Sequence, residues 1–104
     1  MSGGPVTITK DVTITKDMGV THAEFFRLLP KALGPGAYST DGARVVRQVG
    51  SRRLEITLGP EGTRKLALMR VPRTEVRLSF QGYSDSDRAA ALALFDRAFQ
   101  RAGG

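Results

Sequence analysis

The chain has 104 residues, of which 40% are hydrophobic and 25% are charged, a composition typical of one folded domain of modest size. Cysteine is absent, which excludes disulfides, thiolate zinc sites and cysteine nucleophiles. The formal net charge is +6, which favours an anionic partner over a cationic one. Neither a secretory signal pattern nor a run of about eighteen apolar residues occurs, so we expect one soluble, cytoplasmic domain spanning residues 1–104.

A perfect tandem repeat, VTITKD followed by VTITKD, occupies residues 6–17. Because its period is even, the alternation of apolar and polar side chains stays in register across the join. We expect residues 12–16 to form a strand, residues 6–11 to be a redundant copy of it, and residues 1–5 to be flexible. A spare strand of this kind could pair with the sheet edge of a second chain, so a homo-oligomer through the N-terminal strand is an open alternative.

A helix is expected to begin at His22. Thr21 followed three residues later by Glu24 is a capping box, in which each residue bonds to the backbone of the other. Pro30 removes a backbone donor and should stop or kink the helix before a last turn that ends at Gly34.

Four segments of strand length then follow, separated by short loops that contain Gly or Pro. The segments are residues 43–49, 52–58, 64–71 and 74–80, and they predict an antiparallel meander. The second and fourth alternate between apolar and polar side chains, which indicates one buried and one wet face. Because the third is apolar on both faces, we expect it to be an interior strand. Turns are expected at residues 49–52, 59–62 and 71–74.

A second helix is expected from a cap at Ser84 to Ala102, with acidic side chains in its first turn. The sequence therefore predicts an α+β fold in the order β-α-β-β-β-β-α, with a kinked N-terminal helix and a long C-terminal helix on one face of the sheet.

The positive charge is concentrated in the meander, where residues 44–77 contain nine basic and three acidic side chains. An up-and-down meander places its first and third turns at the same end. Five arginines would meet there, and their guanidinium groups suit phosphate or carboxylate oxygens. The expected anion-binding residues are Arg47, Arg52, Arg53, Arg70 and Arg73.

These observations favour a small, non-catalytic module that binds nucleic acid backbone or an acidic protein. The wet face lacks the aromatic side chains that stack bases, so contact with nucleic acid would be through phosphates and sensitive to salt. A lone histidine, His22, cannot form a zinc site or a triad, and no phosphate loop or calcium loop is present. We expect no catalytic residue, no cofactor, no metal and no membrane partner.

Two resemblances give alternative functions. The order of elements is similar to a shortened helix-grip fold, as in polyketide cyclase and START-type proteins, which implies an apolar ligand held between the sheet and the last helix. The expected cavity residues are Phe25, Leu28, Leu78, Leu92, Phe95 and Phe99. The terminal Gly103-Gly104 resembles the end of ubiquitin-like sulfur carriers and implies a carrier protein, although the helix expected before it is a strand in those carriers.

Overall fold

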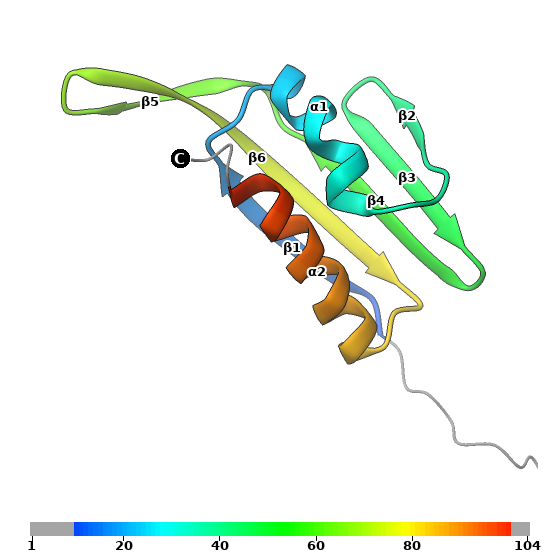
Figure 1. Cartoon of the computed structure of the whole chain (residues 1–104). Coiled ribbons are helices and arrows are strands. Elements are labelled where there is room, and N and C mark those ends of the chain that lie inside the picture. The colour runs from blue at the N-terminus through cyan, green and yellow to red at the C-terminus, as the bar shows by residue number, and fades with distance from the viewer. Residues whose placement is uncertain (1–9, 101–104) are drawn as a thin grey trace, which may run out of the picture.

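The computed structural model describes residues 10–100, which form two helices and one antiparallel sheet. Both helices lie on the same face of the sheet (Figure 1). The elements in chain order are β1 (Val12–Met18), α1 (His22–Leu33), β2 (Ser39–Asp41), β3 (Arg44–Val49), β4 (Arg52–Leu58), β5 (Gly62–Leu66), β6 (Met69–Gln81) and α2 (Asp85–Gln100). The predicted α+β class is confirmed.

The sheet is organised around β6, which pairs with three other strands. The strand order is β1-β6-β4-β3-β2, and β5 pairs with the first part of β6 alone. The second copy of the repeat forms β1, as predicted, and lies at one edge of the sheet. The first copy through Thr9, the segment expected to be flexible and the terminal Gly103-Gly104 lie outside the described residues.

The first helix begins as its sequence predicts. Thr21 Oγ1 accepts the Glu24 backbone N–H at 3.0 Å, and Glu24 Oε1 accepts the Thr21 N–H at 3.2 Å. The helix does not stop at Pro30 but continues to Leu33 and is capped by Gly34. At the start of α2, Ser84 Oγ accepts the Asp87 N–H at 3.1 Å, which confirms the predicted cap.

The core lies between the apolar face of the sheet and the two helices. Alternate residues of β4 and β6 are buried, including Ile56, Val76 and Leu78, which are each 0% exposed. Phe25 of α1 lies against Phe95 and Phe99 of α2, with ring centroids 6.2 and 5.1 Å away. The helices therefore contact each other as well as the sheet.

The predicted third strand is wrong in its position. Residues 64–71 do not cross the interior of the sheet but fold into a hairpin, with Leu66 paired to Met69 across a turn at Ala67 and Leu68. The turn expected at residues 71–74 is also wrong, because β6 runs without a break through Pro72. A further short strand, β2, pairs with β3 and was not predicted.

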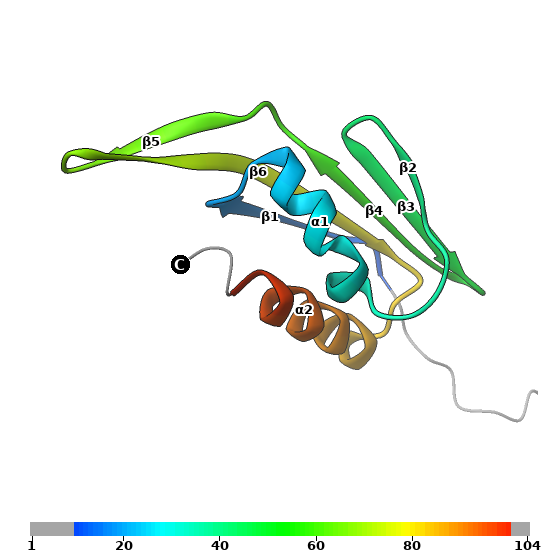
Figure 2. The same ribbon diagram turned by 45° about the horizontal axis from the view of Figure 1, so that its top comes forward.

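This hairpin extends well beyond the rest of the sheet. Figure 2 shows β5 and the start of β6 projecting past the helices as a two-stranded ribbon. The radius of gyration is 15.6 Å, whereas a compact domain of this size has about 13 Å. Five paired positions, at about 3.3 Å of rise each, give the ribbon a length of roughly 17 Å. We call residues 62–73 the arm.

Candidate functional site

The five arginines predicted to meet at one end of the sheet lie in separate places. Arg52 and Arg53 begin β4, and Arg53 pairs with Gln81 at the far end of β6. Arg70 and Arg73 lie in the arm, eight or more positions away along β6, which corresponds to about 26 Å or more at the rise of a strand. The predicted single cluster required the turn at 71–74 and does not form.

Four of these five arginines already have partners within the body of the domain, and Arg73, bonded to Asp17 of β1, is one of them. Arg47 of β3 reaches the C-terminal end of α1. It donates to the carbonyl oxygens of Leu33, at 2.5 Å, and of Pro35. Its positive charge there stabilises the negative end of the helix dipole. Arg53 lies 3.5 Å from Glu55. Arg52 has the loosest partner, Asp87, at 3.9 Å.

The wet face of the sheet is largely neutralised by its own carboxylates. Arg44 Nε donates to Glu55 at 2.7 Å, and this hydrogen bond holds the pKa of Glu55 below its ordinary value. Arg77 lies 3.9 Å from Glu75 on the same face, a looser pair that neutralises its charge only in part. This face therefore offers an anionic partner little uncompensated charge.

The arm differs from the wet face in both charge and exposure. It contains four basic side chains and no acidic one, and residues 62–70 are all exposed. Lys65 and Arg70 are directly opposite each other in the pairing of β5 with β6. Within residues 10–100 neither of them forms an ion pair. Like charges in such a position repel each other unless an anion lies between them.

Two carboxylates, those of Asp17 and Glu61, fix the root of the arm to the body of the domain. Asp17 of β1 accepts from Arg73 Nε at 2.8 Å and from Arg64 at 2.6 Å. The hydrogen bond from Arg73 lowers the pKa of Asp17. On the other side of the root, Glu61 Oε1 accepts the His22 N–H at 2.5 Å, and the His22 ring lies 2.7 Å from the Gly59 carbonyl oxygen. The arm therefore projects from a braced base.

The Asp17 bridge should make the order of the arm depend on pH. Since the pKa of Asp17 is lowered in the folded chain, its contribution is present above 3.8, the ordinary pKa of aspartate, and is lost as the pH falls through the lowered pKa. We expect the ¹⁵N heteronuclear NOE of arm amides to fall on acidification in the wild type. In Asp17→Asn it should be low at neutral pH and should change little. Equal pH dependence in both proteins would contradict this role of Asp17.

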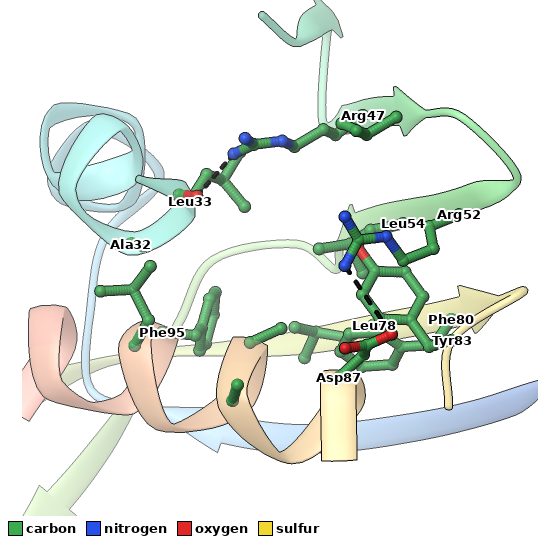
Figure 3. A pocket seen from close by; sticks show the side chains of 14 residues that line it. Ala32, Leu33, Arg47, Arg52, Leu54, Leu78, Phe80, Tyr83, Asp87 and Phe95 are labelled. Atoms are coloured by element: carbon green, nitrogen blue, oxygen red, sulfur yellow. Dashed lines mark hydrogen bonds and ion pairs between the residues drawn. The ribbon is translucent and has the colours of Figure 1, made fainter. Parts of the chain in front are cut away.

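A pocket of about 280 Å³ lies at the other end of the molecule, between the end of α1, the start of β4 and the start of α2. Its floor is apolar and includes Leu54, Leu78 and Phe95, while Arg52 and Asp87 face each other at its rim (Figure 3). The guanidinium carbon of Arg52 lies 5.6 Å from the centre of the Tyr83 ring. Burial raises the pKa of Tyr83, so its hydroxyl is neutral at physiological pH.

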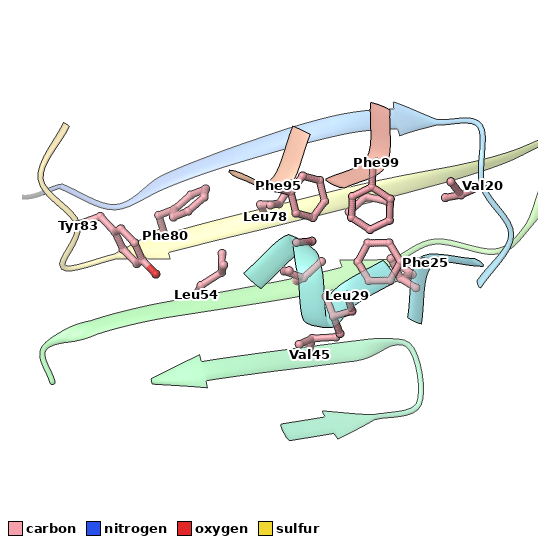
Figure 4. Packing of buried hydrophobic residues seen from close by; sticks show 14 residues of the cluster. Val20, Phe25, Leu29, Val45, Leu54, Leu78, Phe80, Tyr83, Phe95 and Phe99 are labelled. Carbon is pink, nitrogen blue, oxygen red and sulfur yellow. The ribbon is translucent and has the colours of Figure 1, made fainter. Parts of the chain in front are cut away.

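The residues expected to form an apolar cavity do not lie around one space: Leu28 lines a separate pocket between the two helices, Leu92 packs at the edge of the core, and the other four divide between the first pocket and the packed core. Leu78 and Phe95 line the pocket, but Phe25 and Phe99 are stacked on each other with their ring planes 13° apart (Figure 4). The two rings are in contact, so no ligand fits between them. The first pocket lies beside the start of α2, whereas the sequence predicted a cavity that extends toward the end of this helix.

Sequence reasoning overlooked Lys65 and the apolar tip of the arm. Leu66, Leu68 and Met69 are 54%, 98% and 66% exposed, although the apolar pattern around them predicts an interior strand. The useful signal was the flanking charge, because Arg64 and Lys65 on one side and Arg70 on the other would be costly to place inside a core.

Comparison with known proteins gives no family assignment: the chain matches no protein-family model, no curated protein and no solved structure at a significant level. Between residues 10 and 100, neither helix has the length and apolar character needed to cross a bilayer. In the same span, His, Asp and Glu side chains do not gather in a group of three that could hold a metal ion.

Proposed function

We propose that this protein is a non-catalytic binding module that engages double-stranded DNA through its arm. The observation that carries the proposal is the cross-strand pair of Lys65 and Arg70, two exposed cations that are held opposite each other without a carboxylate from residues 10–100 between them. A phosphate group between them would relieve their repulsion and accept hydrogen bonds from both.

The shape of the arm supports duplex DNA over other anions. A two-stranded ribbon fits the major groove of B-DNA, which is about 12 Å wide, whereas the major groove of duplex RNA is too deep and narrow for side chains to read. The arm is long enough to enter such a groove, and its root is braced by Asp17 and Glu61. Arg64 and Arg73 are already bonded to Asp17. They would therefore fix the position of the ribbon and contribute less than Lys65 and Arg70 to the attraction of DNA.

The apolar tip adds a second kind of contact. Proteins that bind the minor groove insert leucine, isoleucine, methionine or proline side chains between base pairs and so kink the duplex, and we propose the same kind of insertion from the major groove. Leu68 is almost fully exposed at the tip of the arm, and its burial between bases would remove apolar surface from water. The arm therefore combines phosphate contacts along its length with a wedge at its end.

The test is the salt dependence of binding to a fluorescein-labelled 30-base-pair DNA duplex. The double variant Lys65→Gln/Arg70→Gln should reduce the slope of log K against log salt by about 0.9, because the two side chains share one phosphate and each phosphate contact contributes about 0.9. Leu68→Ser should weaken binding with little change in this slope. It should also reduce the bend measured by energy transfer between the ends of a doubly labelled duplex.

The matched control is Arg27→Gln/Lys31→Gln, which removes one arginine and one lysine from the exposed surface of α1. This variant should keep the wild-type slope. If it loses as much slope as the arm variant, attraction is due to net charge and the proposal is wrong. The proposal is also wrong if the wild type does not bind DNA. In that case, loss of binding to polyglutamate or to phosphatidylserine vesicles in the arm variant would identify a different partner for the arm.

A further inference from the structure

The pocket between α1, β4 and α2 is independent of the arm and has a chemistry of its own. Its interior is apolar, with Leu54, Leu78 and Phe95 in the floor. Small side chains leave the space open where the helices approach it, namely Ala32 of α1 and Ala90 and Ala91 of α2. Pockets that bind small molecules are mostly apolar, with a few polar groups that fix the orientation of the ligand.

The polar group at this rim is Arg52, and its present interaction is weak. Charge-assisted N–H to carboxylate bonds are about 2.7–2.9 Å long, as Arg73 and Asp17 show at 2.8 Å. The distance from Arg52 to Asp87 is 3.9 Å, and the Arg52 side chain is 42% exposed. Arg52 therefore lies above the pocket with most of its hydrogen-bonding capacity unused by Asp87.

The neighbours of Arg52 keep its guanidinium group over the opening. The ring of Tyr83 lies beneath it at 5.6 Å, and this ring is fixed edge-on against Phe80, with centroids 5.0 Å apart. Arg47 also lines the pocket, but it is bonded to the carbonyl oxygens at the end of α1. Arg52 is therefore the cation available to a ligand.

We infer that this pocket binds a small amphipathic carboxylate, with its acid group on Arg52 and its apolar body on Leu54, Leu78 and Phe95. The pocket volume of about 280 Å³ is at the lower limit for ligand pockets, which selects a single aromatic ring or a short branched chain over a long fatty acid. On binding, Arg52 would exchange its distant partner, the Asp87 carboxylate, for the ligand's carboxylate within hydrogen-bonding distance.

The experiment compares 4-phenylbutyrate with the neutral 4-phenylbutanol by NMR titration of the ¹⁵N-labelled full chain. For the wild type we expect saturable shifts centred on the pocket, with the acid binding roughly tenfold more tightly, as one charge-assisted hydrogen bond would give. Arg52→Met should abolish this preference and retain binding of the alcohol. Since the Arg52 side chain is partly exposed and methionine keeps most of its apolar stem, the variant should fold, and its amide spectrum shows whether it does.

Two further variants make the result decisive. Arg53→Met, the neighbouring arginine on the wet face, should keep the tenfold preference. Ala91→Leu should fill the pocket and weaken binding of both compounds. The inference is overturned if neither compound binds, if acid and alcohol bind equally, or if Arg53→Met loses the preference as fully as Arg52→Met does. It does not depend on whether the arm binds DNA.

Discussion

Replacing Phe25 with alanine is expected to lower the free energy of unfolding by about 3–5 kcal/mol, the range for truncating a buried phenylalanine. Phe25 is 0% exposed and contacts both aromatic rings that α2 contributes to the core. Its removal would leave a cavity where α1 and α2 meet. Because small domains are stable by only about 5–15 kcal/mol, urea denaturation followed by circular dichroism should show a large fall in the midpoint.

The control for this measurement is Leu68→Ala, which also truncates a large apolar side chain. Leu68 is 98% exposed, so its loss should change the free energy of unfolding by less than about 0.5 kcal/mol. If both variants were equally destabilised, the tip of the arm would be packed in solution, and its proposed role as an exposed wedge would be contradicted.

Local signals in the sequence predicted much of the body of the domain. The capping box of Thr21 and Glu24 and the cap at Ser84 fix where the helices begin, because each depends on residues within one turn. The alternation in residues 52–58 gave the correct buried face, with Leu54, Ile56 and Leu58 inside. Such features need no knowledge of what lies elsewhere in the chain.

The arm could not be predicted by the same reasoning because its turn carries none of the usual residues. Ala67 adopts φ of 55°, a left-handed conformation that normally selects glycine or asparagine. Pro72 predicts a turn at residues 71–74, yet it lies within β6. It is tolerated because β1 pairs with β6 only from Thr74 and β4 only from Val76, so at Pro72 the strand has a single neighbour, β5.

Misplacing that one turn also decided the outcome for the candidate site. With a turn at 71–74, Arg70 and Arg73 would have returned to the end of the sheet that carries Arg52. With the turn at Ala67 and Leu68, the same two arginines lie along an exposed ribbon. The sequence indicated which residues carry the excess charge. Their grouping in space depends on which strands pair over long range, and local sequence patterns do not reveal that pairing.

Replacing Gly82 with alanine is expected to destabilise the protein by about 2–5 kcal/mol, the sum of two costs. Gly82 has φ of +75°, which costs an L-residue about 1–2 kcal/mol. A Cβ atom there would also lie 2.1 Å from the Ser51 carbonyl oxygen and 3.5 Å from the Arg52 Cα atom, and displacing this backbone costs about 1–3 kcal/mol more. Thermal denaturation would measure the loss.

Gly42→Ala separates the two costs, because Gly42 has φ of +59° and open space around it. Gly42→Ala should have only the first cost, a destabilisation of about 1–2 kcal/mol. If the two variants lost the same stability, the close approach of Gly82 to Ser51 would be of no consequence. That approach matters for the pocket, because it places the β3–β4 turn beside the loop before α2, and Arg52 and Tyr83 directly follow Ser51 and Gly82 in the chain. Gly82→Ala should therefore also weaken 4-phenylbutyrate binding, while Gly42→Ala should leave it unchanged.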